Sequence, residues 1–196
     1  RQIGASLDWS REAFTFDDQR NLAVRTAFKK MYDAGLIYRG HRVINWDPKG
    51  QTSVSDDEVQ HKPEKGTLYT FKYSADFPIS IATTRPETKV GDTAIAVHPD
   101  DKRYKEYIGK EFKVNFARTN LNIKIISDNS IDQTFGTGAV GVTPAHSLVD
   151  ADIAQRQNLT MLQVINEYAR MTDKDGEHVV RKKTKEAREI IVRWLK

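Results

Sequence analysis

The chain of 196 residues is 38% hydrophobic and 30% charged, which excludes a disordered protein and predicts a globular one. It has no cysteine, which excludes disulfides and thiolate zinc sites, and its apolar runs are too short to span a membrane. The net charge of +4 is that of an ordinary solvated surface. The absence of cysteine fits a cytoplasmic protein. The five scattered histidines form no metal-binding spacing, so we expect no metal and no other cofactor.

Residues 1–45 predict an N-terminal helical connector. The chain does not begin with methionine and opens in what reads as the middle of a domain, so we expect a piece of a longer protein. Apolar side chains recur at helical spacing between residues 17 and 34, with Thr15 or Asp17 as the cap and Gly35 at the end.

Residues 46–170 predict the domain core. A turn at 47–50 and a polar loop at 53–66 precede several short β-like segments that are separated by turn signals. Few long helices lie between these segments, which favours an α+β fold with a compact mixed β-barrel-like core and peripheral helices over a doubly wound sheet. The expected strands are 68–73, 79–84, 94–97, 112–116, 123–126 and 139–143, and the expected helices are 101–107 and 147–157.

Residues 171–196 predict a C-terminal connector helix, preceded by a turn at 173–176. Because a domain inserted into a host must return its two ends close together, we expect this helix to pack near the N-terminal one. The basic run at 181–185 can meet nucleic-acid phosphates, although we favour solvent exposure. One apolar face of the helix is marked by Ala187, Ile190, Ile191, Trp194 and Leu195.

The stretch 136–150, GTGAVGVTPAHSLVD, is a candidate floor of a binding site. Its first glycines allow a close approach of backbone to a ligand. Ser147 can cap the helix that follows, so Asp150 falls in the first helical turn, where the helix dipole stabilises a carboxylate. A carboxylate beside bare backbone is suited to holding an ammonium group. The alternative is that Asp150 merely caps the helix.

A second candidate stretch is ATTRPET at residues 82–88. Pro86 biases Arg85 towards an extended conformation, so the preceding strand ends here and presents a polar tip. The arginine can engage a phosphate or carboxylate in a forked geometry, and the threonine hydroxyls can contact a ribose or a small polar side chain. The alternative is a turn in which Glu87 pairs with Arg85.

His146 is the candidate general base, because an imidazole titrates near neutral pH. A single histidine after Pro-Ala is, however, more often a local hydrogen-bonding residue. The order of residues supports no Ser/His/Asp triad. If the site hydrolyses a substrate, we therefore expect a directly activated water and no covalent intermediate.

The motif TTRPET, followed by GTGAV, PAH and Asp150, resembles the editing domain inserted into the class I aminoacyl-tRNA synthetases for valine, isoleucine and leucine. The flanking segments GASLDWSRE, GLIYRG, INWDPKGQTSVSD and TRPETKVGDTAIAVHPDDKRY are most similar to the valyl member. The resemblance covers nearly the whole chain. The synthetic signatures HIGH and KMSKS are absent, so we do not expect this chain to activate an amino acid.

The resemblance implies post-transfer editing, in which positioned water, assisted by the substrate's own ribose hydroxyl and without a metal, hydrolyses the ester of Thr-tRNA(Val). It implies that the aminoacylated tRNA 3′ end is a partner, together with the rest of the synthetase in cis, and we expect this chain to be a monomer. Asp150 aligns with the aspartate that holds the α-amino group. The implied catalytic residues are Asp150, Arg85 and Thr88, and the implied substrate-binding residues are Thr83, Thr84, Glu87, Gly136, Thr137, Gly138, His146 and Ser147.

Two departures from the valyl pattern leave alternatives open. The pattern commonly reads GTGAVK and PAHD, whereas this chain has Gly141 and Ser147 in place of the lysine and the first aspartate. These two residues belong to the part of the pocket that would read the threonine hydroxyl, and Asp152 is a weak candidate to compensate. The alternatives are isoleucyl-type clearance of Val-tRNA(Ile) and a module that binds the tRNA acceptor end with weakened hydrolysis.

Overall fold

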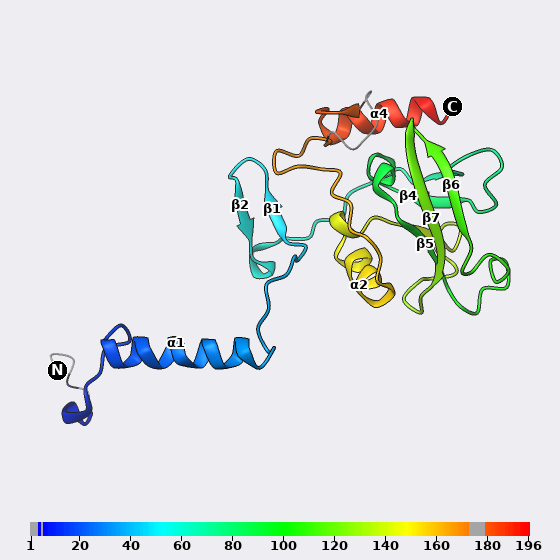
Figure 1. Cartoon of the computed structure of the whole chain (residues 1–196). Coiled ribbons are helices and arrows are strands. Elements are labelled where there is room, and N and C mark those ends of the chain that lie inside the picture. The colour runs from blue at the N-terminus through cyan, green and yellow to red at the C-terminus, as the bar shows by residue number, and fades with distance from the viewer. Residues whose placement is uncertain (1–3, 5, 173–178) are drawn as a thin grey trace. The chain divides into compact units, whose positions relative to one another are not determined.

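The computed structural model describes residues 4, 6–172 and 179–196, and the turn expected at 173–176 lies outside them. The chain divides into two compact units, Arg1–Arg42 and Val43–Lys196 (Figure 1). The functional residues expected from the sequence all belong to the second unit. None of the described helices is both long and apolar enough to cross a membrane.

The first unit is built around helix α1, Asp18–Asp33, which follows the short 3-10 helix η1, Trp9–Arg11. The Asp17 carboxylate accepts the Arg20 N–H at 2.8 Å and caps the start of α1. Gly35, at φ +71°, ends the helix in a Schellman motif, since the N–H of Leu36 donates to the carbonyl of Met31. The helix predicted at 17–34 is confirmed, and its packing near the C-terminal helix stays a prediction.

A β-hairpin opens the second unit and consists of β1, Asn45–Asp47, and β2, Thr52–Val54. The Asp47 carboxylate accepts the backbone N–H groups of Lys49 and Gly50, which confirms the turn predicted at 47–50. The loop predicted at 53–66 is partly wrong. It begins inside β2 and contains the 3-10 helix η2, Asp56–Glu58, because strand pairing and a capping box override its polar composition.

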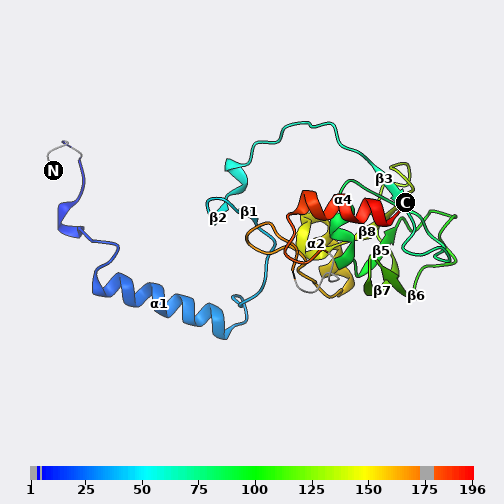
Figure 2. The ribbon, with the colours of Figure 1, turned by 90° about the horizontal axis from the view of Figure 1, so that it is seen from above.

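The core of the second unit is an open, mixed four-stranded sheet in the order β6-β7-β5-β8 (Figures 1 and 2). Strand β5 pairs parallel with β7 and antiparallel with β8. The expected β-barrel-like closure is not found in the described residues, because β3 and β4 pair with each other in a separate ladder. Each predicted strand overlaps an observed one, although β3 and β4 are shorter than predicted and β7 is longer. The observed strands are Tyr69–Phe71 (β3), Ile81–Thr83 (β4), Ala94–Val97 (β5), Glu111–Phe116 (β6), Thr119–Ser127 (β7) and Ala139–Val142 (β8).

The sheet is buried on both faces along β5, whereas β6 and β7 alternate with exposed residues and leave one face open there. Ala94 and Ala96 pack in a cluster with Ile153 of helix α2, Leu148–Gln157. Ile95 and Val97 pack in a larger cluster with buried residues of helix α4, Thr184–Trp194. Burial of apolar side chains on both faces is the main source of stability in such a layered fold. The helices predicted at 147–157 and at the C-terminus are confirmed.

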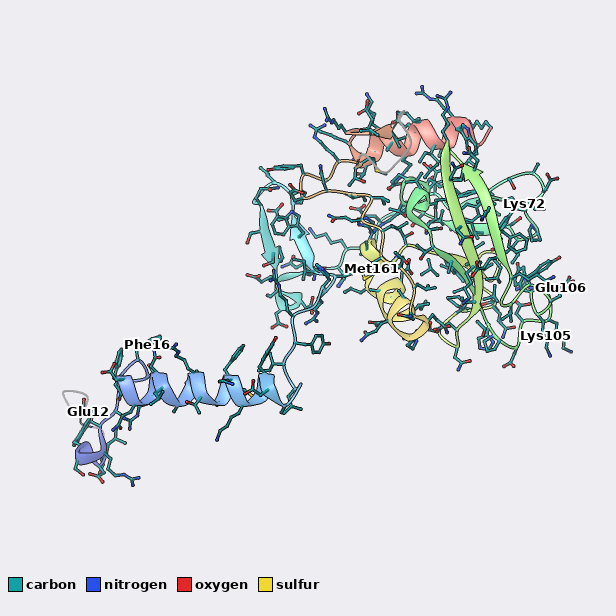
Figure 3. All side chains as sticks on the ribbon, viewed as in Figure 1. Glu12, Phe16, Lys72, Lys105, Glu106 and Met161 are labelled. Atoms are coloured by element: carbon teal, nitrogen blue, oxygen red, sulfur yellow. The ribbon has the colours of Figure 1, made fainter. Side chains whose placement is uncertain are left out.

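The helix predicted at 101–107 is wrong, because the chain forms a series of turns there. Tyr104 N–H donates to the Asp101 carbonyl, and Tyr107 N–H donates to the Tyr104 carbonyl. The Asp101 carboxylate accepts the backbone N–H of Arg103, a local bond that competes with helix formation. Lys105 and Glu106 point outward from these turns (Figure 3).

Candidate active site

A cleft of about 530 Å³ lies where two segments distant in sequence meet, and residues 43–45, up to the start of β1, also line it. One segment comprises residues 83–89, from the end of β4 into the 3-10 helix η3, Pro86–Gly91. The other comprises residues 140–150, from β8 through the 3-10 helix η4, Pro144–His146, into α2. The expected site residues that line this cleft are Thr83, Thr84, Arg85, Thr88, His146, Ser147 and Asp150.

Arg85 stands at an exposed turn of the first segment. Its backbone N–H donates to Thr83 Oγ1 at 3.1 Å, and its carbonyl accepts the Thr88 hydroxyl at 3.0 Å. Pro86, at the start of η3, fixes the turn that these bonds close. Within the described part of the chain, the Arg85 guanidinium has no ion-pair partner, so it is free to meet an anion.

Glu87 does not line the cleft, although the sequence placed it among the substrate-binding residues. Its side chain is 3% exposed and forms a bidentate ion pair with Arg188 of α4, at 2.6 and 2.8 Å. The alternative in which Glu87 pairs with Arg85 is therefore wrong. The carboxylate joins η3 to the C-terminal helix and is not available to a ligand.

Asp150 is half-buried in the first turn of α2. Its Oδ2 accepts the backbone N–H of Thr143 at 2.8 Å, whereas Ser147 is the residue that caps the helix. The interpretation of Asp150 as only a helix cap is therefore wrong. Among the described residues nothing donates to its Oδ1, so one oxygen of a fixed carboxylate remains able to accept a bond from an ammonium group.

His146 is fixed as a neutral imidazole. Its Nε2 accepts the backbone N–H groups of Val164 and Ile165 at 2.9 and 3.1 Å, so the ring proton is on Nδ1. Burial, with the nearby charges of Arg85 and Lys89, lowers the pKa of His146 to about 4. At neutral pH, His146 can donate from Nδ1 but has no free lone pair, which contradicts the general-base interpretation.

The floor of the cleft contains a buried polar network that the sequence did not reveal. The Asp92 carboxylate, 1% exposed, accepts the hydroxyls of Tyr73 and Thr143 and pairs with Lys89 at 3.1 Å. Burial raises the pKa of Asp92, and the Lys89 charge opposes this rise. Burial and the Asp92 charge raise the pKa of Tyr73 well above its ordinary value. The sequence offered one sign of this network: Lys89 and Asp92 carry opposite charges three residues apart.

This network explains why position 141 is a glycine. A Cβ at Gly141 would lie 2.1 Å from Asp92 Oδ2 and 2.6 Å from the Tyr73 hydroxyl, so any side chain would displace both groups. The Lys89 ammonium donates to the Gly141 carbonyl at 2.7 Å. In the valyl pattern, the residue at position 141 is a lysine. Here the buried cation beside that position is the ammonium group of Lys89.

Gly136, Thr137 and Gly138 do not line the cleft, in contrast to the prediction. A Cβ at Gly136 would lie 2.5 Å from the Ala82 Cβ, and the Thr137 carbonyl accepts the Tyr104 hydroxyl at 2.7 Å. Gly138 has φ +74° and lies against the Arg103 guanidinium. These residues shape the entry to β8 by close packing and occupy no wall of the cleft.

Comparison with known proteins places the chain among the tRNA synthetases. The family of class I tRNA synthetases (I, L, M and V) matches residues 1–190, and the chain belongs to this family. This result confirms the resemblance drawn from the sequence motifs.

Similar relatives are valine--tRNA ligases. That of Thermotoga maritima is 46% identical over the whole chain, and that of Staphylococcus carnosus is 49% identical over 90% of it. The chain spans only about a fifth of their length, 22% and 20%. A solved LeuRS from Agrobacterium radiobacter K84, in a ternary complex with tRNA and LeuAMS, is 20% identical, with a TM-score of 0.43 over 95% of this chain and 32% of that one.

Proposed function

We propose that the cleft hydrolyses the ester that joins a wrongly attached amino acid, threonine, to the terminal adenosine of tRNA(Val). The observation that carries this proposal is that Arg85 and Asp150, from distant segments, line one cleft. The free oxygen of Asp150 accepts the α-ammonium group of the amino acid. Hydroxyls of Thr83, Thr84 and Thr88 face the ribose, and Arg85 meets the nearest phosphate.

Hydrolysis in this cleft uses water directly. Ser147 caps α2, and His146 uses its Nε2 for two backbone bonds, so the two do not form a nucleophile–base pair. Water attacks the ester carbonyl carbon, the bond from that carbon to the ribose oxygen breaks, and the ribose oxygen takes up a proton. The chain orients the ester and the water and places charged groups beside them, and both effects contribute strongly to rate acceleration in enzymes.

A valyl synthetase needs such a second site for a physical reason. A hydrophobic pocket shaped for valine rejects the isosteric threonine only about 100-fold, a magnitude known for valyl enzymes themselves. The cleft described here has a polar floor, formed by Lys89, Thr143 and the network behind them. A polar lining favours threonine over valine, because an exposed cleft hydroxyl such as that of Thr84 can bond to the threonine hydroxyl and not to a methyl group.

We also propose that the cleft works as part of a whole synthetase. The unit Val43–Lys196 would receive the tRNA 3′ end in the cytoplasm, with the rest of the synthetase in cis holding the tRNA body. The chain by itself would be a monomer. The regions proposed for these roles are a connector at 1–45, an editing core at 46–170 and a returning helix within 171–196.

The proposal is tested by deacylation of Thr-tRNA(Val) by the chain and by Asp150→Asn. The amide still accepts the Thr143 N–H but carries no charge, so we expect hydrolysis to slow about 10- to 100-fold, the worth of one charge-assisted hydrogen bond. Asp152→Asn is the matched control and should stay near the parent rate, because Asp152 is exposed two residues further along α2 and does not line the cleft, so it does not compensate for Ser147 there.

The substrate arms of this experiment separate the alternatives. Faster clearance of Val-tRNA(Ile) than of Thr-tRNA(Val) would replace the threonine proposal by an isoleucyl-type one. Saturable binding of the tRNA end without turnover would leave only a binding module. Equal rates for the chain and Asp150→Asn would remove Asp150 from its assigned role.

A further inference from the structure

Lys89 lies at the junction of the two segments that form the cleft, and we infer that it is a positioning residue that sets their spacing. The inference rests on the proposed hydrolysis and deepens it. Lys89 follows Arg85 and Thr88 in the first segment, and its ammonium reaches two residues of the second. No other described cation makes a hydrogen bond or ion pair from residues 83–89 to residues 140–150.

The ammonium uses all three of its protons within the protein. It donates to Gly141 O at 2.7 Å, to Thr143 Oγ1 at 2.8 Å and to Asp92 Oδ1 at 3.1 Å. Its side chain is only 6% exposed, although the residue lines the cleft. A saturated ammonium does not bind a ligand itself, so Lys89 acts through the groups that it holds.

The group through which it acts is Thr143. The Thr143 side chain is held by Lys89 and Asp92, and its backbone N–H donates to Asp150 Oδ2. Lys89 is thereby connected through one residue to the carboxylate proposed to bind the substrate ammonium. Displacement of a reacting group by about 1 Å can cost about 100-fold in rate, so this connection is expected to matter for turnover.

The absence of cysteine permits a direct test by chemical replacement. Lys89→Cys is unfolded, alkylated and refolded in two forms. Aminoethylation restores an ammonium at nearly the length of lysine, whereas S-propylation gives a neutral side chain of similar size. Lys105→Cys, at an exposed turn (Figure 3), is taken through the same steps as the refolding control.

The readouts are kcat and KM for a threonyl ester of adenosine, and the amide chemical shift of Thr143. We expect the aminoethyl form to recover kcat within a few-fold of the parent. The S-propyl form should lose about 100-fold in kcat and move the Thr143 amide signal. Because that form leaves Asp92 unpaired, Lys89→Met/Asp92→Asn serves as a second, uncharged variant, which should fold and show the same loss.

The possible results either support or overturn the inference. Parental kcat and an unmoved Thr143 signal in the S-propyl form or in the double variant would overturn it. Failure of a folded aminoethyl form to recover activity would do the same. If the parent chain does not hydrolyse the ester, the proposed function fails. The Thr143 signal then decides by itself whether Lys89 positions the cleft.

Discussion

Arg188 of α4 holds the carboxylate of Glu87 with two hydrogen bonds, at 2.6 and 2.8 Å, and so connects the C-terminal helix to η3, which begins within the TTRPET motif. Glu87 is almost completely buried, whereas Arg188 is 37% exposed. The pair therefore lies between a surface salt bridge and a buried one in its expected contribution to stability.

Arg188→Ala should lower the free energy of unfolding by about 2 kcal/mol, because it leaves a buried carboxylate without its partner. Urea denaturation at pH 7 measures this change. Arg193→Ala is the matched control on the same helix, since Arg193 lies 3.9 Å from an exposed Glu189 and should cost less than about 0.5 kcal/mol. Equal losses of unfolding free energy in the two variants would show that the Glu87–Arg188 pair stabilises the chain no more than an exposed ion pair.

His146 should make the unfolding free energy depend on pH in the acid range. Its folded pKa of about 4 lies below the ordinary 6.5, so the unfolded chain binds the proton first as the pH falls. The stabilisation is present in full above pH 6.5 and is lost between about pH 6.5 and 4, with a slope of at most ~1.4 kcal/mol per pH unit.

His146→Gln should flatten this part of the stability profile, because the amide oxygen can accept a backbone N–H without titrating. His41→Gln, at an exposed position of the first unit, is the control and should leave the slope unchanged. Urea titrations at several pH values give the slopes, and an NMR titration of the ring gives the pKa directly. A ring that titrates near 6.5 would contradict the buried neutral imidazole.

Gly141→Ala should destabilise the chain by about 1–3 kcal/mol, the usual effect of overpacking, because its Cβ would overlap Asp92 and Tyr73. Gly66→Ala has no atom within 4 Å of its new Cβ and should have little effect. Thermal unfolding of both variants measures the difference. A Gly141→Ala chain as stable as the parent would mean that the buried network has room to move.

Local patterns in the sequence predict the regular elements well. The strand at 94–97 is found at its predicted bounds, since an apolar run between turn residues specifies a buried strand whatever its partners. The helix near 101–107 fails because a single aspartate side chain captures the backbone N–H of Arg103. Closure of the sheet is not found among the strands that the structure describes, and sequence patterns alone do not settle it, since strand pairing depends on contacts between distant segments.

For the candidate site too, local features could be predicted from the sequence and long-range contacts could not. Arg85 and Asp150 are predictable because a strand tip and a helix start are local features with known chemistry. The partners of Glu87 and Lys89 are not predictable, since Arg188 and Thr143 come from distant parts of the chain. Glycines are the hardest to interpret, because a tight packing position and a ligand-facing wall require the same residue type.

The central claim is that Asp150 and Arg85 bind one substrate in one cleft, and the structure of the chain bound to a non-hydrolysable analogue of threonyl-adenosine 5′-phosphate tests it most directly. We expect the Arg85 guanidinium to contact that phosphate. We predict that the α-amino group donates to Asp150 Oδ1 and that the ribose lies against the threonine hydroxyls of residues 83–88. An analogue bound outside the cleft, or bound with its amino group beyond hydrogen-bonding reach of Asp150, would contradict the claim.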